Sequence, residues 1–371
     1  MQIRPKYSKA RFFRFDGVRL AAILRSTSET YIGLEDVDLS GYLILTGGTG
    51  LLGRYLIKDL LEAGQRLAVI VRGSRRESAA HRIETVLQEW ERQLGRSLPR
   101  PVVLEGDLRQ DRLGLNESQI RWIERHGSAM IHSAASLKFE SDTEGEPFRT
   151  NVDGTRHVLS LCRAARLSQL HYVSTAYVCG LRSGTIYETE LDEGQTFRND
   201  YERSKHQAET ILREASDSDQ IQLTVYRPAV ISGDATTGFT NTYHGIYLYL
   251  RLMALIAPQH PIGADGKRHT PVRIPMLGDE PRNVVPIDWV SRVMTRLLLT
   301  PDAHGNTYHL APDHRLTPRE VMDAGCSYYG TTGIAYIGQQ PIDPCTFNSI
   351  EALVFANAGI YNRLRDDRSA F

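Results

Sequence analysis

The sequence contains little cysteine, no excess of charge of either sign and no long hydrophobic run. Only four of its 371 residues are cysteines, and no two of them form a CxxC pair. This scarcity argues against a zinc site and a disulfide framework, so we expect no metal and a reducing, cytoplasmic location. Lys and Arg together number 44 and so do Asp and Glu, so the total charge gives no reason to expect nucleic acid as a partner.

The sequence shows no segment that is expected to cross a membrane. The most lipophilic stretch, 245–258, is too short to span a bilayer and contains Arg251, so an amphipathic helix is the better interpretation. The N-terminus is basic and has no apolar core of signal-peptide length. A transit peptide is a less favoured interpretation of this start, and we therefore expect no transmembrane segment.

From Leu43 onward, short β-rich runs alternate with longer helical patterns. Most of the runs are compact and apolar, as expected for strands that are buried on both faces. The alternation predicts an α/β fold with a Rossmann-type, doubly wound parallel sheet. The expected strands lie near 42–46, 67–72, 101–105, 128–132, 170–174 and 221–227, and the expected helices at 51–63, 77–95, 116–126, 151–166 and 201–215.

The pattern also suggests a division of the chain. Residues 1–40 precede the first strand as an extension of unknown role, and 41–237 form the Rossmann domain. From 238 to 371 we expect mainly a smaller, C-terminal substrate-binding region, because 238–285 are rich in Gly, Pro, His and Tyr without regular alternation. Segments near 286–310, a helix followed by a strand, should return to the Rossmann domain, and a further helix should begin at Thr317.

A glycine-rich turn between the first strand and the first helix carries the clearest signal. Gly47 permits a tight turn, Gly50 allows a close approach to a pyrophosphate, and Gly53 lets the helix pack on the strand. The helix that follows presents free N–H groups and a positive dipole end to the phosphates. The predicted dinucleotide-binding residues of this turn are Thr46, Gly47, Thr49, Gly50, Leu51, Leu52 and Gly53.

The end of the second strand indicates which dinucleotide binds. An NAD site usually has an acidic residue here, whereas Arg72 occupies the position and no acid follows before Glu77. An arginine suits the 2′-phosphate of NADP(H), with Arg82 on the next helix as a second contact. We therefore expect NADPH as the cofactor, although an exposed basic loop would look the same.

Two further strand ends fit the same site, because ligands of open α/β sheets bind at the carboxyl ends of the strands. Asp107 and Leu108 follow the third strand, where an aspartate could accept a hydrogen bond from the adenine amino group. The small residues Ser133, Ala134 and Ala135 follow the fourth strand, where they would let the cofactor lie close to the backbone.

Tyr201 and Lys205 form the one Tyr-x-x-x-Lys pair of the chain, on a predicted helix. Their i, i+4 spacing places both side chains on one helical face. A nearby ammonium stabilises a phenolate, so Tyr201 could exchange a proton with a substrate oxygen while Lys205 also binds the cofactor ribose. Thr175, at the end of the fifth strand, is the candidate for orienting the substrate carbonyl, and Ser174 is a second candidate.

Taken together, these motifs resemble the extended short-chain dehydrogenase/reductase family. Segments that resemble its thioester-reductase branch are 106–108 with 113–115, 132–139 (HSAASLKF), 173–178 (VSTAYV) and 283–288 (NVVPID). That branch includes fatty acyl-CoA reductases and the terminal reductase domains of carboxylic acid reductases and carrier-protein assembly lines. The resemblance extends from about Leu43 to Leu310.

The resemblance implies a catalytic triad of Thr175, Tyr201 and Lys205, and it adds Asn151, Pro228 and Val230 to the cofactor site. The implied reaction is NADPH-dependent reduction of an acyl thioester, on coenzyme A or on an acyl carrier protein, to the aldehyde, with a second reduction giving the alcohol. A carrier would act in trans or belong to a larger parent protein. The acyl chain could lie under 238–280, where residues from His244 to Leu255 would form a lid helix or simply pack in the core.

Three other functions remain as alternatives. A sugar-nucleotide epimerase or dehydratase with tightly held NAD would share the superfamily, but Arg72 and the apolar 245–257 segment argue against it. A hydroxysteroid-type dehydrogenase would act on a free alcohol or ketone. A non-catalytic NADP-binding sensor would keep the glycine turn but would need neither Tyr201 nor Lys205.

Overall fold

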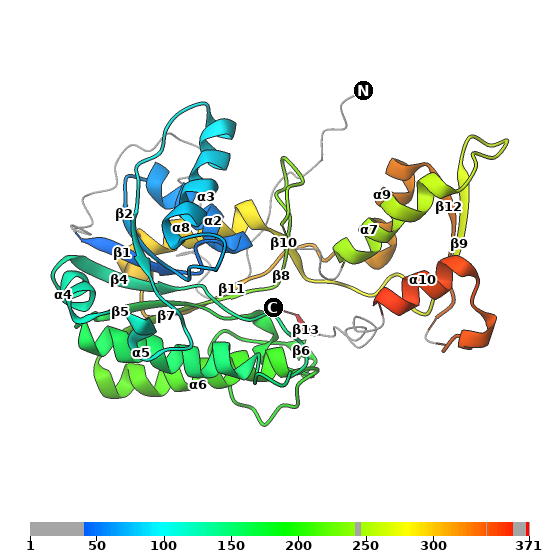
Figure 1. Ribbon diagram of the computed structural model, residues 1–371. Helices are drawn as coiled ribbons and strands as arrows, with labels where there is room; N and C mark the ends of the chain where they lie inside the picture. Colours follow the sequence, from blue (N-terminus) through cyan, green and yellow to red (C-terminus); the bar gives the residue numbers. More distant parts are fainter. Residues whose placement is uncertain (1–40, 242–245, 339, 359–368, 371) are drawn as a thin grey trace.

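The computed structural model describes residues 41–241, 246–338, 340–358 and 369–370. The extension at 1–40 and His244, the expected start of the lid helix, lie outside these residues. Two lobes are visible in Figure 1, a larger one built on a sheet and a smaller one formed by the later part of the chain. None of the helices in the described ranges is both long and apolar enough to cross a membrane.

The larger lobe contains a seven-stranded sheet in which every pairing is parallel, with the order β11-β7-β5-β4-β1-β2-β3. This topology confirms the predicted Rossmann-type fold. Its strands are β1 (Tyr42–Thr46), β2 (Arg66–Val71), β3 (Val102–Glu105), β4 (Gly127–His132), β5 (Gln169–Val173), β7 (Gln222–Pro228) and β11 (Thr307–Leu310). Each lies within about two residues of its expected place, because strands buried on both faces are continuous apolar runs in the sequence.

Helices cover both faces of the sheet (Figure 1). On one face, α2 (Leu51–Glu62), α3 (Ala79–Leu94) and α8 (Ile287–Leu298) share a core with Leu43 and Leu45 of β1. On the other face, α4 (Glu117–His126), α5 (Gly154–Ala164) and α6 (Asp200–Asp219) share a core with Ile44. Successive residues of β1 therefore enter two different cores, which is why this strand shows no polar face.

Capping decides where some of these helices begin. The helix expected over 77–95 begins at Ala79, because the side chain of Ser78 accepts a hydrogen bond from the backbone N–H of His81. Asn199 caps α6 in the same way by accepting from the N–H of Glu202. The helix expected over 151–166 is a π-helical turn, Arg149–Asp153, followed by α5.

The smaller lobe has its own hydrophobic core. A pair of parallel strands, β9 (Arg268–Ile274) and β12 (Thr331–Tyr336), packs with α7 (Ile246–Ile256), α9 (Pro318–Tyr329) and α10 (Ser349–Ala358). Its buried residues are Leu252, Ile256, Val272, Ile274, Met322, Ile350 and Val354. Since α7 supplies the first two, packing in this core accounts for much of the apolar character of 245–258.

Two short strand pairs lie outside the main sheets. β8 (Val230–Ser232) pairs with β10 (Val284–Pro286), and β6 (Gly184–Thr185) pairs with β13 (Ser369–Ala370). The chain leaves the sheet lobe after β8, returns at β10 for α8 and β11, leaves again after β11 and is back at β13. The remaining short turns are η2 (Asp111–Gly114), η4 (Ala176–Cys179), η5 (Ala257–Gln259), η6 (Pro301–Ala303) and η7 (Pro344–Thr346).

Candidate active site

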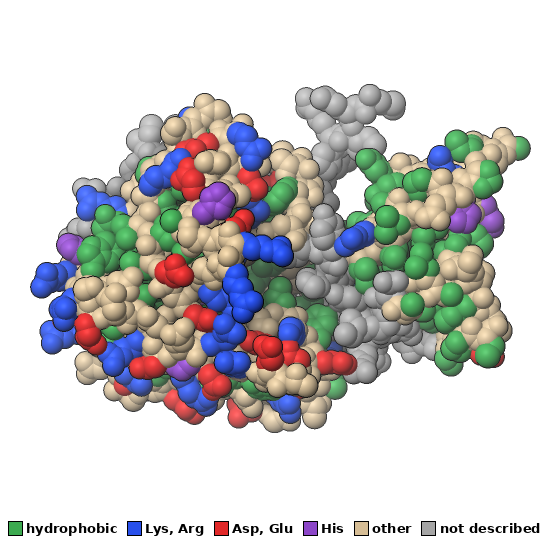
Figure 2. Space-filling model, viewed as in Figure 1, with side chains coloured by type: hydrophobic (Ala, Val, Ile, Leu, Met, Phe, Trp, Pro, Cys, Tyr) green, Lys and Arg blue, Asp and Glu red, His purple; other side chains and the backbone are tan. Residues whose placement is uncertain are grey.

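A cavity of about 1000 Å³ lies at the carboxyl ends of the strands and reaches the smaller lobe. Figure 2 shows Lys and Arg side chains gathered on the sheet lobe near the junction of the two lobes. The cavity lining includes the basic residues Arg72, Arg82, Arg109 and Lys138. Strand ends of a doubly wound sheet are the expected position for a ligand, and the basic residues suit phosphate groups.

The structure brings the residues chosen from the sequence together, with one exception. Asn151 does not line the cavity. All the others do, namely Thr46, Gly47, Thr49, Gly50, Leu51, Leu52, Gly53, Arg72, Arg82, Asp107, Leu108, Ser133, Ala134, Ala135, Thr175, Tyr201, Lys205, Pro228 and Val230.

The glycine turn leaves no room for side chains, which fits a dinucleotide. Gly47 has a φ of +80°, and a Cβ there would lie 2.7 Å from the backbone nitrogen of Ala134. A Cβ on Gly53 would lie 2.1 Å from the carbonyl oxygen of Gly47. The N-terminus of α2 has no side-chain cap at Gly50, so its N–H groups face the cavity free to receive a pyrophosphate.

Arg82 joins the glycine turn to the end of β2. Its guanidinium donates to the carbonyl oxygen of Arg72 at 2.6 Å and to the hydroxyl of Thr49 at 3.1 Å. The side chain of Arg72 is exposed at the mouth of the cavity. An acid that the sequence reasoning did not consider, Glu105 at the end of β3, lies against Gly73, whose Cβ would come within 2.4 Å of its carboxylate.

Asp107 lines the cavity with both carboxylate oxygens engaged by a neighbour. The guanidinium of Arg109 donates to Oδ1 and Oδ2 of Asp107 at 2.7 to 3.1 Å, and its backbone N–H donates to Oδ1 at 3.0 Å. These bonds, more than any other cause, hold the pKa of Asp107 below its ordinary value. Asp107 is therefore an ionised acceptor at neutral pH, and Arg109 is a cavity residue that no sequence motif indicated.

A chain of buried hydrogen bonds fixes the loop 133–136 after β4. Burial lowers the pKa of His132 to about 3, so the ring is neutral and has one donor and one acceptor nitrogen. The hydroxyl of Thr155 donates to the Asn151 carbonyl at 2.6 Å and lies 3.4 Å from Nε2 of His132. Nε2 is then the donor, and Nδ1 accepts from Thr46 at 2.9 Å.

Asn151 supports the same loop from below the cavity. Its Oδ1 accepts from the N–H of Ser136 at 2.8 Å, and its Nδ2 donates to the Ser136 carbonyl at 3.0 Å and to the Ser204 hydroxyl at 2.9 Å. Since Ser204 belongs to α6, Asn151 links the cofactor loop to the helix that carries Tyr201. Its side chain is buried, so any effect on a cofactor passes through the loop.

Lys205 lines the cavity with a buried side chain, and its ammonium is held by the backbone of β5. Its Nζ donates to the carbonyl of Val173 at 2.7 Å and lies 4.2 Å from the ring centroid of Tyr172. Burial lowers the pKa of Lys205 to about 7, while the charge of Glu209 acts in the opposite direction. The ammonium is thus poised to change its charge near neutral pH.

Tyr201 and Thr175 meet on the cavity wall. Burial, together with the charge of Glu202, raises the pKa of Tyr201 to about 12, and a hydrogen bond with Thr175 acts against this rise. The hydroxyl of Thr175 also lies 3.5 Å from the carbonyl oxygen of Pro228 and accepts from the N–H of Tyr177. A phenol with this pKa holds its proton at neutral pH and can donate it to a substrate oxygen.

The second hydroxyl considered for the substrate, that of Ser174, points elsewhere. It donates to the carboxylate of Glu209 at 2.6 Å in the interior. Of the two neighbouring residues, Thr175 is therefore the one whose hydroxyl is placed to contact a ligand in the cavity.

The far side of the cavity belongs to the smaller lobe, and its residues carried no recognisable motif. They are largely apolar or aromatic, and come from α7, β9 and its C-terminal continuation, and the start of α9: Tyr247, Tyr249, Ile274, Met276, Leu316, Val321 and Met322. The predicted segment at 245–257 thus reaches the site through Tyr247 and Tyr249. Among the described residues, no group of His, Cys, Asp and Glu is arranged to hold a metal ion.

The parallel sheet, the glycine turn and the Thr175, Tyr201 and Lys205 constellation define an NAD(P)-binding oxidoreductase of the extended short-chain dehydrogenase/reductase type. More particularly, the chain belongs to the male sterility protein family of NAD-binding domains, whose family model matches residues 45–294.

Curated relatives agree with this assignment. The nonribosomal peptide synthetase FrzA of Cladobotryum is 26% identical over 75% of this chain and 27% of its own length. The aldehyde reductase lnaA of Aspergillus flavus is 28% identical over 77% of this chain and 27% of its own length. This chain therefore spans about a quarter of these relatives.

Solved structures show the same similarity. The terminal R domain of the myxalamid biosynthetic pathway is 27% identical, with a TM-score of 0.66, covering 86% of this chain and 79% of that one. A thiolation-reductase di-domain from an archaeal nonribosomal peptide synthetase, 19% identical, shares the fold with a TM-score of 0.64, over 88% of this chain and 66% of that one.

Proposed function

We propose that this protein is an NADPH-dependent reductase that converts an acyl thioester to an aldehyde. The observation that carries the proposal is the position of Thr175, Tyr201 and Lys205, which line one continuous cavity together with the glycine turn and the apolar wall of the smaller lobe. A cofactor bound at the glycine turn and an acyl group on the apolar wall would both reach Thr175, Tyr201 and Lys205.

The pKa of Tyr201 suits the role of a proton donor. A reductase needs a proton donor at the carbonyl oxygen, and the raised pKa of Tyr201, about 12, keeps its phenol protonated at neutral pH. Thr175 would donate a second hydrogen bond to the same oxygen, so the two hydroxyls stabilise the negative charge that develops there. Lys205 would bind the cofactor ribose, and its ammonium would place a positive charge beside Tyr201.

NADPH would supply the hydride for the carbonyl carbon. In balance, thioester, NADPH and a proton give aldehyde, thiol and NADP⁺, and a second round would give the alcohol. Hydride addition to the carbonyl carbon and proton transfer from Tyr201 to its oxygen would give a hemithioacetal. When its C–S bond breaks, the C=O bond re-forms, the hydroxyl proton returns to Tyr201, and the departing thiolate takes up a proton from solvent. The residues of this chain orient the carbonyl, hold the proton at Tyr201 Oη and exclude water from the apolar side.

NADPH rather than NADH is proposed because of the basic residues at the end of β2. Arg72 and Arg82 both line the cavity at that end, where the adenosine ribose of a dinucleotide would lie. Glu105 is nearby and opposes a phosphate, but it does not line the cavity, whereas both arginines do.

For the substrate, we assign residues 238–371, apart from the return segment near 286–310, to acyl binding. The apolar wall formed by Tyr249, Ile274 and Met322 supports an acyl group rather than a sugar nucleotide. Relatives that are named as peptide synthetases support a thioester on a carrier protein, in trans or within a longer chain, with acyl-CoA as the simpler form. The four cysteines, all free, agree with a reducing cytoplasmic compartment that would keep a product thiol reduced.

Loss of NADPH absorbance, followed with a panel of acyl-CoA, acyl-carrier, nucleotide-sugar and ketone substrates, tests this function. We expect consumption with acyl thioesters, together with the appearance of free thiol. The Tyr201→Phe variant is the control for background oxidation. Consumption with only ketones or nucleotide sugars would contradict the proposal.

A further inference from the structure

The catalytic helix α6 carries a carboxylate one turn after Lys205. Glu209 has no exposed surface, yet its side chain is ionised, because its partners are basic or hydroxylic. It accepts from Nε and Nη2 of Arg227 at 3.2 and 2.7 Å, from the guanidinium of Arg213 at 2.9 Å and from the Ser174 hydroxyl at 2.6 Å. A buried charge of this kind is stable only when it is fully paired.

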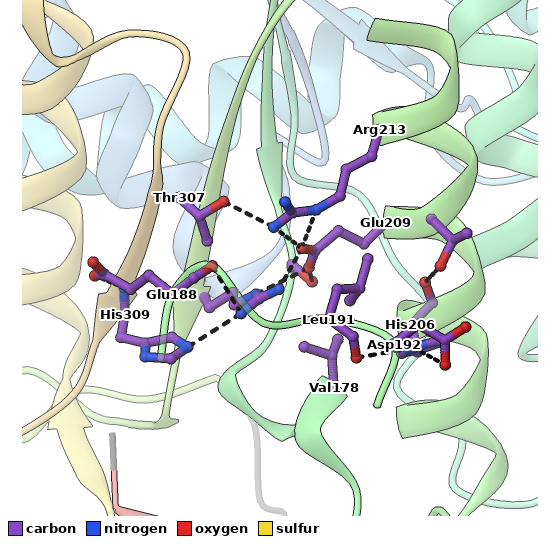
Figure 3. Close-up of polar contacts among 12 residues, drawn as sticks. Val178, Glu188, Leu191, Asp192, His206, Glu209, Arg213, Thr307 and His309 are labelled. Atoms are coloured by element: carbon purple, nitrogen blue, oxygen red, sulfur yellow. Dashed lines mark hydrogen bonds and ion pairs between the residues drawn. The ribbon is translucent and has the colours of Figure 1, made fainter. Parts of the chain in front are cut away.

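The pairs connect α6 with three strands of the sheet. Figure 3 shows Glu209 and Arg213 on α6, facing Thr307 and His309 on β11, with dashed lines between the partners. Arg213 donates to the hydroxyl of Thr307 at 3.0 Å. Arg227, on β7, has no exposed surface either and lies 3.4 Å from Nε2 of His309. This hydrogen-bonded group therefore extends from Ser174 to His309, which are more than 100 residues apart in the sequence.

We propose that Glu209 is a positioning residue of the active site, which keeps Lys205 charged and fixes the strand end that carries Thr175. It touches no cavity surface and is not a catalytic residue. Its effect passes through Lys205 on its own helix and through Ser174, the residue that follows β5. The inference rests on the proposed hydride-transfer function only for its activity measurements.

The first part of the proposal follows from the surroundings of Lys205. Burial lowers the pKa of this lysine and the charge of Glu209 acts against burial, with a pKa of about 7 as the net result. The other groups near the ammonium are the carbonyl of Val173, the ring of Tyr172 and the neutral His132. None of these carries a negative charge, so loss of the Glu209 carboxylate would lower the pKa of Lys205 further and leave less of the ammonium form at neutral pH.

Glu209 can fulfil this task because it is itself held ionised. Burial would raise its pKa, but the charge and hydrogen bonds of Arg227, the hydroxyl of Ser174 and the charge of Arg213 together bring the pKa below its ordinary value. On the far side of the group, burial and Arg227 lower the pKa of His309 to about 3. His309 is therefore neutral and does not compete with Arg227 for Glu209.

The second part of the proposal follows from the chain neighbours of its partners. Ser174 immediately precedes Thr175, so the bond from Ser174 to Glu209 anchors the chain just after the end of β5. Arg227 immediately precedes Pro228, whose carbonyl oxygen lies 3.5 Å from the hydroxyl of Thr175. One carboxylate thus fixes both strands that flank Thr175.

Glu209→Gln tests the charge at nearly constant volume. In this variant the high-pH limb of the kcat profile should move down by about one pH unit, because a carboxylate close to an ammonium changes its pKa by this amount or more. The high-pH limb of NADPH affinity, measured by fluorescence without substrate, should move in the same way. Glu214→Gln makes the same change at an exposed position of α6 and should leave both profiles unmoved. Glu209→Asp keeps the carboxylate on a shorter side chain, so both profiles should move less than in Glu209→Gln.

Loss of the carboxylate leaves Arg227 buried without its main partner, so Glu209→Gln could fail to fold. The pair Arg227→Gln and Arg227→Lys then decides. The first should let Glu209 take up a proton and so shift the profile downward, whereas the second keeps the charge and should shift it less. A folded Glu209→Gln protein with unmoved profiles and a merely lower melting temperature would overturn the inference. If no thioester is reduced but the NADPH-affinity profile moves, the inference stands and the proposed substrate fails.

Discussion

The ammonium of Lys205, on α6, donates a hydrogen bond of 2.7 Å to the carbonyl oxygen of Val173, the last residue of β5. Two residues later the chain reaches Thr175. The helix that carries Tyr201 and the strand that leads to Thr175 are therefore joined by Lys205, the residue that we propose to bind the cofactor ribose. Small movements of either element would change the active site as a unit.

Removal of the phenolic hydroxyl in Tyr201→Phe should lower kcat by about 10²- to 10⁴-fold, the usual contribution of a positioned acid. NADPH binding should change little, because the ring and Lys205 remain. Stopped-flow reduction and fluorescence titration measure the two effects. Tyr328→Phe, at a side chain that is 83% exposed, is the matched control. Undiminished turnover in Tyr201→Phe would remove Tyr201 from the mechanism.

The rate of reduction should fall as the pH rises above about 7. The pKa of Lys205 is lowered to about 7 by burial, so its charge is present below this pH and is lost above it. The phenol of Tyr201, with a pKa of about 12, keeps its proton throughout this range and should not produce the limb. A kcat profile recorded from pH 6 to 9 tests this assignment, and a flat profile would argue against it.

Arg72→Ala should raise the KM for NADPH by about 10- to 100-fold, which corresponds to the loss of one charge-assisted hydrogen bond to phosphate. The KM for NADH should change much less, because NADH has no 2′-phosphate. Arg76→Ala removes the same charge from an exposed position that does not line the cavity. Equal effects of Arg72→Ala on both cofactors would contradict the 2′-phosphate assignment.

Asn151→Ala should lower the free energy of unfolding by about 2 kcal/mol, because three buried or partly buried hydrogen bonds are lost and the groups of Ser136 are left without these partners. The loop 133–136 should loosen, and the KM for NADPH should rise. Ser204→Ala removes one of the three bonds, together with the bond from the Ser204 hydroxyl to the Tyr201 carbonyl, but leaves both bonds to Ser136 in place, so it should cost about 1 kcal/mol. Denaturant titration and cofactor kinetics measure both effects. A larger loss for Ser204→Ala than for Asn151→Ala would place the support of the loop elsewhere.

Local patterns were sufficient to predict the fold and the centre of the site. The strands are apolar runs, Gly47, Gly50 and Gly53 follow one another at intervals of three residues, and Tyr201 and Lys205 are separated by one helical turn. These signals lie within a few residues of one another in the sequence. The parallel order of the sheet followed from the alternation of strands and helices.

What the sequence could not indicate depends on pairings between distant residues. The capture of Asp107 by Arg109, the bond from Ser174 to Glu209 and the approach of Glu105 to Gly73 depend on side-chain directions that no motif records. The apolar wall combines Tyr249, Ile274 and Met322 from three elements that meet only after folding. For Asn151, the family resemblance pointed to the cofactor, but the buried contacts show a neighbour of the cofactor loop.

The two excursions of the chain into the smaller lobe have a consequence for how this architecture can be rebuilt. The described elements of this lobe come from two separate segments, α7 with β9 and α9 with β12 and α10. A chimera with another acyl specificity would have to exchange both segments together, because each contributes to the same hydrophobic core. The junctions at β8 and β10 lie side by side in one small parallel pair, so both cuts of the first exchange fall at a single well-ordered place.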